Sequence, residues 1–501
     1  MDNIAALMQG FAVAATPINL LMALAGAFVG TIVGLLPGIG PINGVAILLP
    51  IAFAMKLPAT SALILLAAVY MGCEYGGRIA SILVNIPGDA GSVMTTLDGF
   101  PLARKGEAGV ALSISAFASF CGSLLASIGL VFLAPLLAQW ALAFGPAEYF
   151  VLMVFAIACL AGMVGDSPVK TLLACVLGLA LATVGVDANS GVYRFTFGDL
   201  HLSDGIQFVV IVIGLFSISE ILLMLEQSET GAQMLKASGR AWFNLRELSM
   251  VKWTIARSAP LGFLVGVLPG AGASIASAIT YMIEKNINDT DKTFGKGDIR
   301  GVAAPESANN AAAGGAFIPM LTLGVPGSGT TAVMMGALTL YNINPGPTLF
   351  TDQAELVWGL IASMFIANFM LLLMNIPMVG VFARMLAIPN WILVPAIAAI
   401  SLVGVYSIHA TTFDLVLMTA LGFVGYVLRK LDFPMAPLIL GFVLGDMMEQ
   451  NLRRALAISN GDTSVLYGSG ITVAMWIAAV FMLVVPLWLR WKRNNKLIEV
   501  K

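Results

Sequence analysis

Charged residues are scarce in this chain. Asp, Glu, Lys and Arg make up 10% of its 501 residues, whereas soluble globular proteins carry roughly 25%. Apolar residues make up 59%, and the mean hydropathy is +0.94. Windows of about 20 residues with almost no charge are long enough to cross a bilayer as helices. They include residues 18–36, 206–225, 353–376, 411–428 and 471–489. This composition excludes an ordinary soluble domain and predicts an all-α polytopic membrane protein.

Groups that commonly perform catalysis are also few. The chain has two histidines and four cysteines, and no HExxH, DDxxD or CxxC spacing occurs. The Gly-rich stretch PGIGPING lacks the Lys-Ser/Thr of a nucleotide-binding loop. We therefore expect no enzyme activity, no cofactor and no nucleic-acid partner. The only metal that we expect is a possible coupling Na⁺.

The chain contains an internal repeat. The stretch GTIVGLLPGIG from Gly30 aligns with GFLVGVLPGAG from Gly262, and NIPGDAGSVM from Asn85 aligns with GVPGSGTTAV from Gly324. Further matching stretches follow in the same order. Because self-similarity over such distances is the mark of repeat architectures, we expect two similar halves.

The basic loops indicate that the halves have opposite orientation. PLARKGEAG (101–109) is basic, whereas its counterpart at 342–355 has no Lys or Arg; the basic loop at 284–300 corresponds to a short loop in the first half. Under the positive-inside rule this exchange predicts inverted topology. The predicted units are a first inverted repeat over 18–228 with a hairpin tip at 87–92, a basic cytoplasmic connector over 229–257, a second inverted repeat over 258–456 with a tip at 326–331, and a C-terminal transmembrane helix and basic tail over 471–501.

Each half has two Pro-Gly breaks in apolar sequence. Backbone at membrane depth leaves the helix only where it is buried in protein or lines a water-filled cavity. The breaks at 87–92 and 326–331 have the layout of re-entrant helical hairpins. The breaks at residues 37–38 and 269–270 fit either hairpins or broken spans, so we expect about 10–13 membrane segments. A single break of this kind is more often a kink, but paired breaks in inverted halves favour a binding site.

The hairpin tips are the predicted substrate site. Each return arm begins at a tip, where free N–H groups and the positive end of the helix dipole favour an anion. The substrate-binding candidates are Asn85, Gly88, Asp89, Gly91, Ser92, Thr95, Gly327, Ser328, Gly329, Thr330, Thr331, Asn309 and Asn310. The coupling-ion candidates at the first breaks, where free carbonyl groups could coordinate Na⁺, are Pro37, Gly38, Asn43, Pro269, Gly270 and Ser274.

Some roles stay open at this point. A fixed negative charge on Asp89 would repel an anion, so this residue is protonated, pairs with a cation or points away from the pocket. For Asn309 and Asn310, contact with the site and interhelical hydrogen bonding are both possible. Glu74 and Arg78, four residues apart, could neutralise each other on one helix face.

At these residues the sequence resembles the large transmembrane subunit of bacterial tripartite tricarboxylate transporters. The resemblance rests on GLLPGIGP, NIPGDAGSVMTTLDGFPLARKGEAG, APESANNAAAGGAFIPMLTLGVPGSGTTAVMMGAL and INPGPTLF, in this order along nearly the whole chain. It implies a multi-pass protein of the bacterial inner membrane that imports small organic anions such as citrate by secondary transport. The implied partners are a small four-helix membrane subunit and a periplasmic substrate-binding protein, and the implied driving force is a Na⁺ or H⁺ gradient.

Two rival functions remain from the residues alone. Broken helices also build channel filters, but those usually repeat in rings of like orientation. An anion channel and a stand-alone carboxylate carrier are therefore the alternatives. For the transporter we expect elevator-like alternating access, with the long helices predicted at 107–139 and 353–385 as the scaffold.

Overall fold

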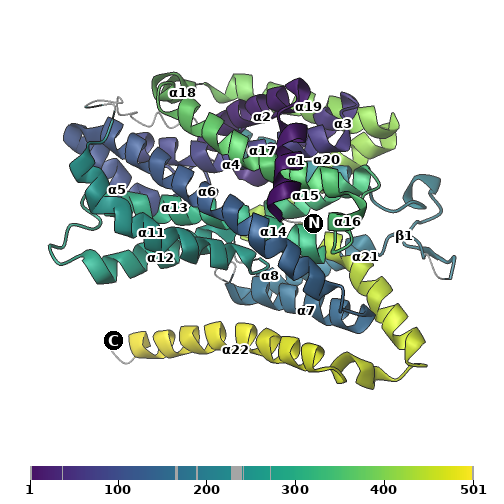
Figure 1. Ribbon diagram of the computed structural model, residues 1–501. Coiled ribbons are helices and arrows are strands. Elements are labelled where there is room, and N and C mark those ends of the chain that lie inside the picture. The colour runs from purple at the N-terminus through teal and green to yellow at the C-terminus, as the bar shows by residue number, and fades with distance from the viewer. Residues whose placement is uncertain are drawn as a thin grey trace.

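The computed structural model describes residues 3–498 except 37, 164–166, 188–189, 227–239, 241, 271 and 387 (Figure 1). The first half of the chain contains α1 (Asn3–Ala14), α2 (Pro17–Leu35), α3 (Gly40–Ala54), α4 (Ala59–Val84), α5 (Val93–Leu102), α6 (Ala108–Ala141), α7 (Pro146–Met163), α8 (Pro168–Ala182), α9 (Phe208–Val212) and α10 (Ser219–Glu226). A π-helical turn, η3 (Ile213–Ile218), joins α9 to α10. The short strands β1 (Gly185–Val186) and β2 (Tyr193–Arg194) pair antiparallel in the loop between α8 and α9.

The second half is also helical. It contains α11 (Leu245–Val267), α12 (Gly272–Asn288), α13 (Ile299–Gly315), α14 (Phe317–Leu323), α15 (Gly329–Leu340), α16 (Leu349–Asp352), α17 (Ala354–Asn375), α18 (Val379–Met385), α19 (Asn390–His409), α20 (Thr412–Lys430) and α21 (Met435–Ile458). The last helix, α22 (Gly470–Ile498), runs along the lower edge of Figure 1 and packs against α7. Of the predicted connector (229–257), residues 229–239 and 241 lie outside the described residues, and its last part, from Leu245 onward, belongs to α11.

Seven helices among the described residues are long and apolar enough to cross a membrane, and six shorter apolar helices accompany them. This architecture is that of a polytopic helical membrane protein. The number of crossings, the opposite orientation of the two halves and the re-entrant path of the hairpins stay predictions.

Close helix contacts at glycine residues, here called glycine seams, occur in both halves. They join α2 to α4 in the first half and α11 to α13 in the second. A Cβ atom at Gly30 of α2 would lie 2.3 Å from the Val69 carbonyl oxygen of α4. A Cβ atom at Gly262 of α11 would lie 2.3 Å from the Ala308 carbonyl oxygen of α13. In both halves the backbones therefore approach so closely that no side chain fits, as the spacing of the small residues predicts.

The described residues of the predicted breaks leave the helix at matching places. Gly38 (φ 89°) and Gly270 (φ 78°) follow α2 and α11, and Asn85 (φ 57°) and Gly324 (φ 65°) end α4 and α14 in the left-handed conformation. Such residues stop a helix without the strain that a larger side chain would suffer. The arms of the two hairpins differ, because α4 is one 26-residue helix whereas the corresponding stretch is divided into α13 and α14 at Ala316.

The two halves are interlocked. The long helix α6 of the first half packs along α13 of the second, and α17 of the second half packs against α4 of the first. Glu306 of α13 reinforces this arrangement by accepting hydrogen bonds from Thr95 of α5 (2.5 Å) and Ser119 of α6 (3.0 Å). The first hairpin is therefore built against helices of both halves.

A buried carboxylate fastens the return arm α5 to the loop before α13. Asp98 is fully buried and accepts hydrogen bonds from the backbone N–H groups of Gly295, Gly297 and Asp298 at 2.8–3.0 Å. The Tyr281 hydroxyl donates a further hydrogen bond at 2.9 Å. Three convergent N–H groups stabilise a negative charge without a cationic side chain.

Asp98→Asn tests this attachment. The amide group would turn one acceptor into a donor that faces N–H groups, so we expect a loss of about 2 kcal/mol in unfolding free energy. The measurement is thermal unfolding of the purified protein in detergent. Asp352→Asn, at an exposed position, is the control and should leave the midpoint unchanged; equal effects at both positions would contradict the role of Asp98.

The glycine seams are tested by adding a methyl group. Gly30→Ala and Gly262→Ala should each destabilise the protein by about 1–3 kcal/mol, because the methyl group meets backbone atoms that cannot move aside. Gly380→Ala is the matched control, since a Cβ atom there would meet nothing within 4 Å. Unfolding midpoints that do not separate the seam variants from the control would show that the seams are looser than described.

Candidate functional site

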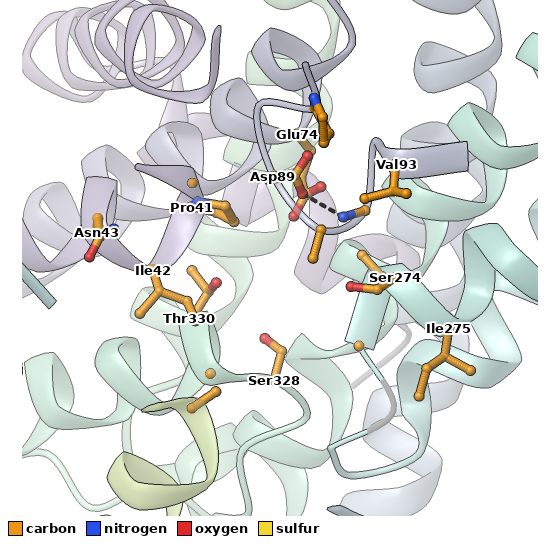
Figure 2. Close-up of a pocket in the computed structure, with 18 of the residues that line it drawn as sticks. Pro41, Ile42, Asn43, Glu74, Asp89, Val93, Ser274, Ile275, Ser328 and Thr330 are labelled. Carbon is orange, nitrogen blue, oxygen red and sulfur yellow. Dashed lines mark hydrogen bonds between the residues drawn. The ribbon is translucent and has the colours of Figure 1, made fainter. Parts of the chain in front are cut away.

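A cavity of about 780 Å³ lies between the two halves (Figure 2). Its wall includes the start of α3 with the residues before it (Gly38–Asn43), Gly270 with the start of α12 (Gly272–Ile275), and both hairpin tips. Apolar side chains complete the wall, among them Leu160, Phe216 and Leu440. The sequence repeat therefore supplies this cavity with equivalent elements from each half.

Four helix N-termini converge on the cavity. The residues at the starts of α3, α5, α12 and α15 all line it. The first N–H groups of a helix have no intrahelical acceptor, and the aligned peptide dipoles place partial positive charge there. Each such end contributes partial positive charge to the cavity without requiring a cationic side chain.

The second tip presents a short hydroxyl-rich surface. Ser328 caps α15: its hydroxyl accepts a hydrogen bond from the Thr331 N–H (3.2 Å), and the Thr331 hydroxyl accepts one from the Ser328 N–H (2.8 Å). Gly329 and Thr330, the first two residues of the helix, line the cavity. In Figure 2, Ser328 and Thr330 border the same open space as Asp89 and Ser274.

The first tip is already occupied by its own carboxylate. Asp89 stands at the position that Ser328 holds in the second half. Its two carboxylate oxygens accept hydrogen bonds from the N–H groups of Gly91 (3.0 Å) and Ser92 (3.2 Å), the first of which is the dashed line in Figure 2. The two tips thus differ in charge and also in backbone path, because α15 begins directly after Ser328 whereas α5 begins at Val93, after a turn that follows Asp89.

Ten of the predicted residues line the cavity, and the others lie behind its wall or outside the described residues. Those on the wall are Gly88, Asp89, Gly91, Ser328, Gly329, Thr330, Gly38, Asn43, Gly270 and Ser274. Those not on the wall are Asn85, Ser92, Thr95, Gly327, Thr331, Asn309, Asn310 and Pro269. Pro37 lies outside the described residues, and the binding roles of all these residues stay predictions.

The Asn pair divides into two different environments. Asn310 donates a hydrogen bond to the Glu306 carbonyl group (3.1 Å) and faces Ser123 of α6. The side chain of Asn309 is fully buried, and neither its oxygen nor its nitrogen has a hydrogen-bond partner. Asn310 therefore serves helix packing, whereas Asn309 leaves two buried polar atoms unsatisfied.

Among the wall residues that were not candidates from sequence, three carry polar or charged side chains: Tyr70, Glu74 and Arg429. Glu74 forms no ion pair with Arg78, which instead contacts Asn375 (3.3 Å) and lies over the Tyr75 ring. The i, i+4 spacing suggested a mutual pair, and only the packing of α4 reveals that the two side chains diverge. Arg429 follows an apolar run, so its sequence context suggests nothing more than a helix end.

Arg429 is the one cationic side chain among the described residues of the wall. It forms an ion pair with Glu220, a buried residue of α10. The positive charge of Arg429 is therefore neutralised by the Glu220 carboxylate.

Comparisons with known proteins identify a family for this chain. A family model described as the tripartite tricarboxylate transporter TctA family matches residues 20–440. The chain is 42% identical over 502 aligned residues, which cover 100% of it and 99% of the relative, to an uncharacterized 52.8 kDa protein in the TAR-I ttuC' 3' region of Agrobacterium vitis.

An uncharacterized protein in the TAR-II ttuC' 3' region of the same organism is 44% identical over 241 residues, or 48% of this chain and 99% of that relative. No solved structure matches. Since the family model covers most of the sequence, the chain belongs to the tripartite tricarboxylate transporter TctA family.

Proposed function

We propose that this chain is the large membrane subunit of a binding-protein-dependent secondary transporter that imports small carboxylates across the bacterial inner membrane. The observation that carries the proposal is the convergence of four helix N-termini, two from each half, on one cavity of about 780 Å³. Helix N-termini at broken membrane helices bind the anionic groups of transported substrates in this way.

The cavity suits a small organic anion. Its volume falls in the range of roughly 300–1,000 Å³ that small-molecule sites occupy. Hydroxyl groups of Ser328 and Thr330 stand beside free helix N–H groups, whereas Phe216 and Leu440 provide apolar surface for a carbon skeleton. The combination favours a carboxylate such as citrate or a related organic acid over an inorganic anion.

The proposed partners follow from the family. They are a small four-helix membrane subunit and a periplasmic substrate-binding protein that delivers the substrate to this cavity. A Na⁺ or H⁺ gradient would drive import, because the chain contains no nucleotide-binding motif.

An elevator-like movement is the proposed route of alternating access. The hairpins would form the moving part, and α6 and α17, which pack against both halves, would belong to the scaffold. The hydrogen bonds from Thr95 and Ser119 to Glu306 connect the first hairpin, α13 and α6. If the hairpin moves relative to α6, either the Thr95–Glu306 bond breaks, or α13 moves with the hairpin and the Ser119–Glu306 bond breaks.

Reconstitution tests the function directly. The chain and its small partner subunit are placed in liposomes, the cognate binding protein is added outside, and uptake of labelled carboxylates is followed. We expect uptake that needs the binding protein and an inward Na⁺ or H⁺ gradient. Uptake that ignores the gradients would favour an anion channel, and gradient-driven uptake without the binding protein would favour a stand-alone carrier.

Ser328→Ala tests the second tip. Loss of the hydroxyl should raise the KM for uptake by about tenfold, corresponding to one lost hydrogen bond to an anion. Ser167→Ala is the matched control, because Ser167 also caps a helix through its side chain but lies outside the cavity. Both variants should lose about 1 kcal/mol of stability; an unchanged KM in Ser328→Ala would remove this tip from the substrate site.

A further inference from the structure

Two carboxyl groups face the same cavity as the proposed anion. Glu74 of α4 is 2% exposed, and its Oε2 atom has no hydrogen-bond partner. Asp89 of the first tip lies beside it in Figure 2, and the two groups are close enough to interact electrostatically. Neither forms an ion pair with a Lys or Arg side chain in the described part of the chain. Glu74 is buried and Asp89 is half-buried, and adjacent carboxylates in such positions without a counter-charge are costly.

A third oxygen points to the same place from the second half. A Cβ atom at Gly91 would lie 2.2 Å from Asn309 Oδ1 and 2.9 Å from Asp89 Oδ2, so both oxygens crowd one side of Gly91. The Asn309 side chain is fully buried and lies next to Glu74, and its Oδ1 atom has no hydrogen-bond donor. Oxygens from α4, the first tip and α13 therefore converge.

We infer that Glu74, Asp89 and Asn309 form a binding site for a monovalent metal cation of the sodium class. Hard cations prefer carboxylate and amide oxygens, and these three residues supply both kinds. Within the described residues, no group of three or more His, Cys, Asp or Glu side chains is arranged to hold a metal ion. Two carboxylates and an amide suit a singly charged ion better than a transition metal.

The amide distinguishes a metal ion from a proton. A proton shared between Glu74 and Asp89 would neutralise the pair but would leave Asn309 Oδ1 without a partner. A sodium ion can be coordinated by all three groups at once. The site also differs in place from the first breaks, whose polar side chains are Ser274 and Asn43; the Asn43 amide already donates a hydrogen bond to the Ile39 carbonyl group.

The position of the site suggests how the cation and the substrate cooperate, and this part rests on the proposed function. Negative charge on Glu74 and Asp89 opposes entry of an anion into the cavity, and a bound cation removes this repulsion. Tyr70, one turn before Glu74 on α4, reaches Ser328 of the second tip through a 3.3 Å hydroxyl contact. By thermodynamic reciprocity, a substrate that binds more tightly with the cation present also tightens cation binding.

The test uses the purified full-length chain in detergent, without substrate or partner proteins. Unfolding midpoints are measured in rising NaCl, with KCl and choline chloride at the same concentrations and the same pH. We expect Na⁺ to raise the midpoint in a saturable manner because it binds the folded state. In Glu74→Gln and Asn309→Ala, half-maximal stabilisation should need at least about tenfold more Na⁺.

Asn310→Ala is the matched control. It removes the neighbouring amide, whose hydrogen bonds go to Glu306 and Ser123, and should keep the wild-type response to Na⁺ even if the protein is less stable. Glu74→Gln preserves shape and volume, so it remains informative if Asn309→Ala fails to fold. An equal response to all three salts would overturn the site, as would a Na⁺ response that both site variants retain.

An unfolding midpoint that changes with pH but not with Na⁺ would also overturn the cation site, because the carboxyl groups of Glu74 and Asp89 would then hold a proton. The outcome is separable from that of the transport assay. Specific Na⁺ stabilisation without uptake would leave the cation site in place and refute the proposed function. Uptake in a protein that does not respond to Na⁺ would do the reverse.

Discussion

The backbone of a membrane protein has to satisfy its N–H and C=O groups within the protein, because the hydrocarbon core offers no partners. A helix that breaks at membrane depth is therefore possible only where other helices surround the break. In this chain the two halves interlock through α6 with α13 and α17 with α4, and Gly88, Gly270 and Gly327 at three of the described breaks are buried, whereas Gly38 is exposed on the cavity wall. The breaks in turn supply the helix N-termini that surround the cavity.

The repeat provides similar backbones, and single substitutions give the two tips different chemistry. The second tip has Ser328, which caps its own helix and leaves the first N–H groups of α15 facing the cavity. The first tip has Asp89 at the corresponding position, where the carboxylate takes up the N–H groups of Gly91 and Ser92. A positive potential suited to an anion and a concentration of oxygens suited to a cation thus lie on opposite sides of one cavity. Under the proposed function, such an arrangement would let the two ligands influence each other's affinity.

The same polar contacts that build the site restrict how it can move. Asp98 ties the return arm α5 to the loop before α13, and Glu306 ties α5 to α6 through Thr95 and Ser119. These buried contacts are strong enough to hold α5, α13 and the neighbouring loop together as one body. A transport movement would therefore take place at a boundary that few hydrogen bonds cross. The boundary between α13 and α6 is one example, where the hydrogen bond from Ser119 to Glu306 would have to break.

The apolar runs, the small-residue spacing and the repeated Pro-Gly pairs predict the membrane class, the described breaks, the glycine seams and part of the cavity wall. These features depend on local composition and on the backbone, which sequence reports directly. Glu74, Arg429 and the different fates of Asn309 and Asn310 could not be predicted in this way. Glu74 and Arg78 look like a mutual pair at i, i+4, but α4 is buried on nearly every side, so its neighbours decide where each side chain points. The sequence by itself determined the membrane class and the places where helices break. Only the tertiary structure decided which polar groups meet, because the partners come from residues far apart in the chain. Asn309 Oδ1, for example, is buried without a hydrogen-bond partner.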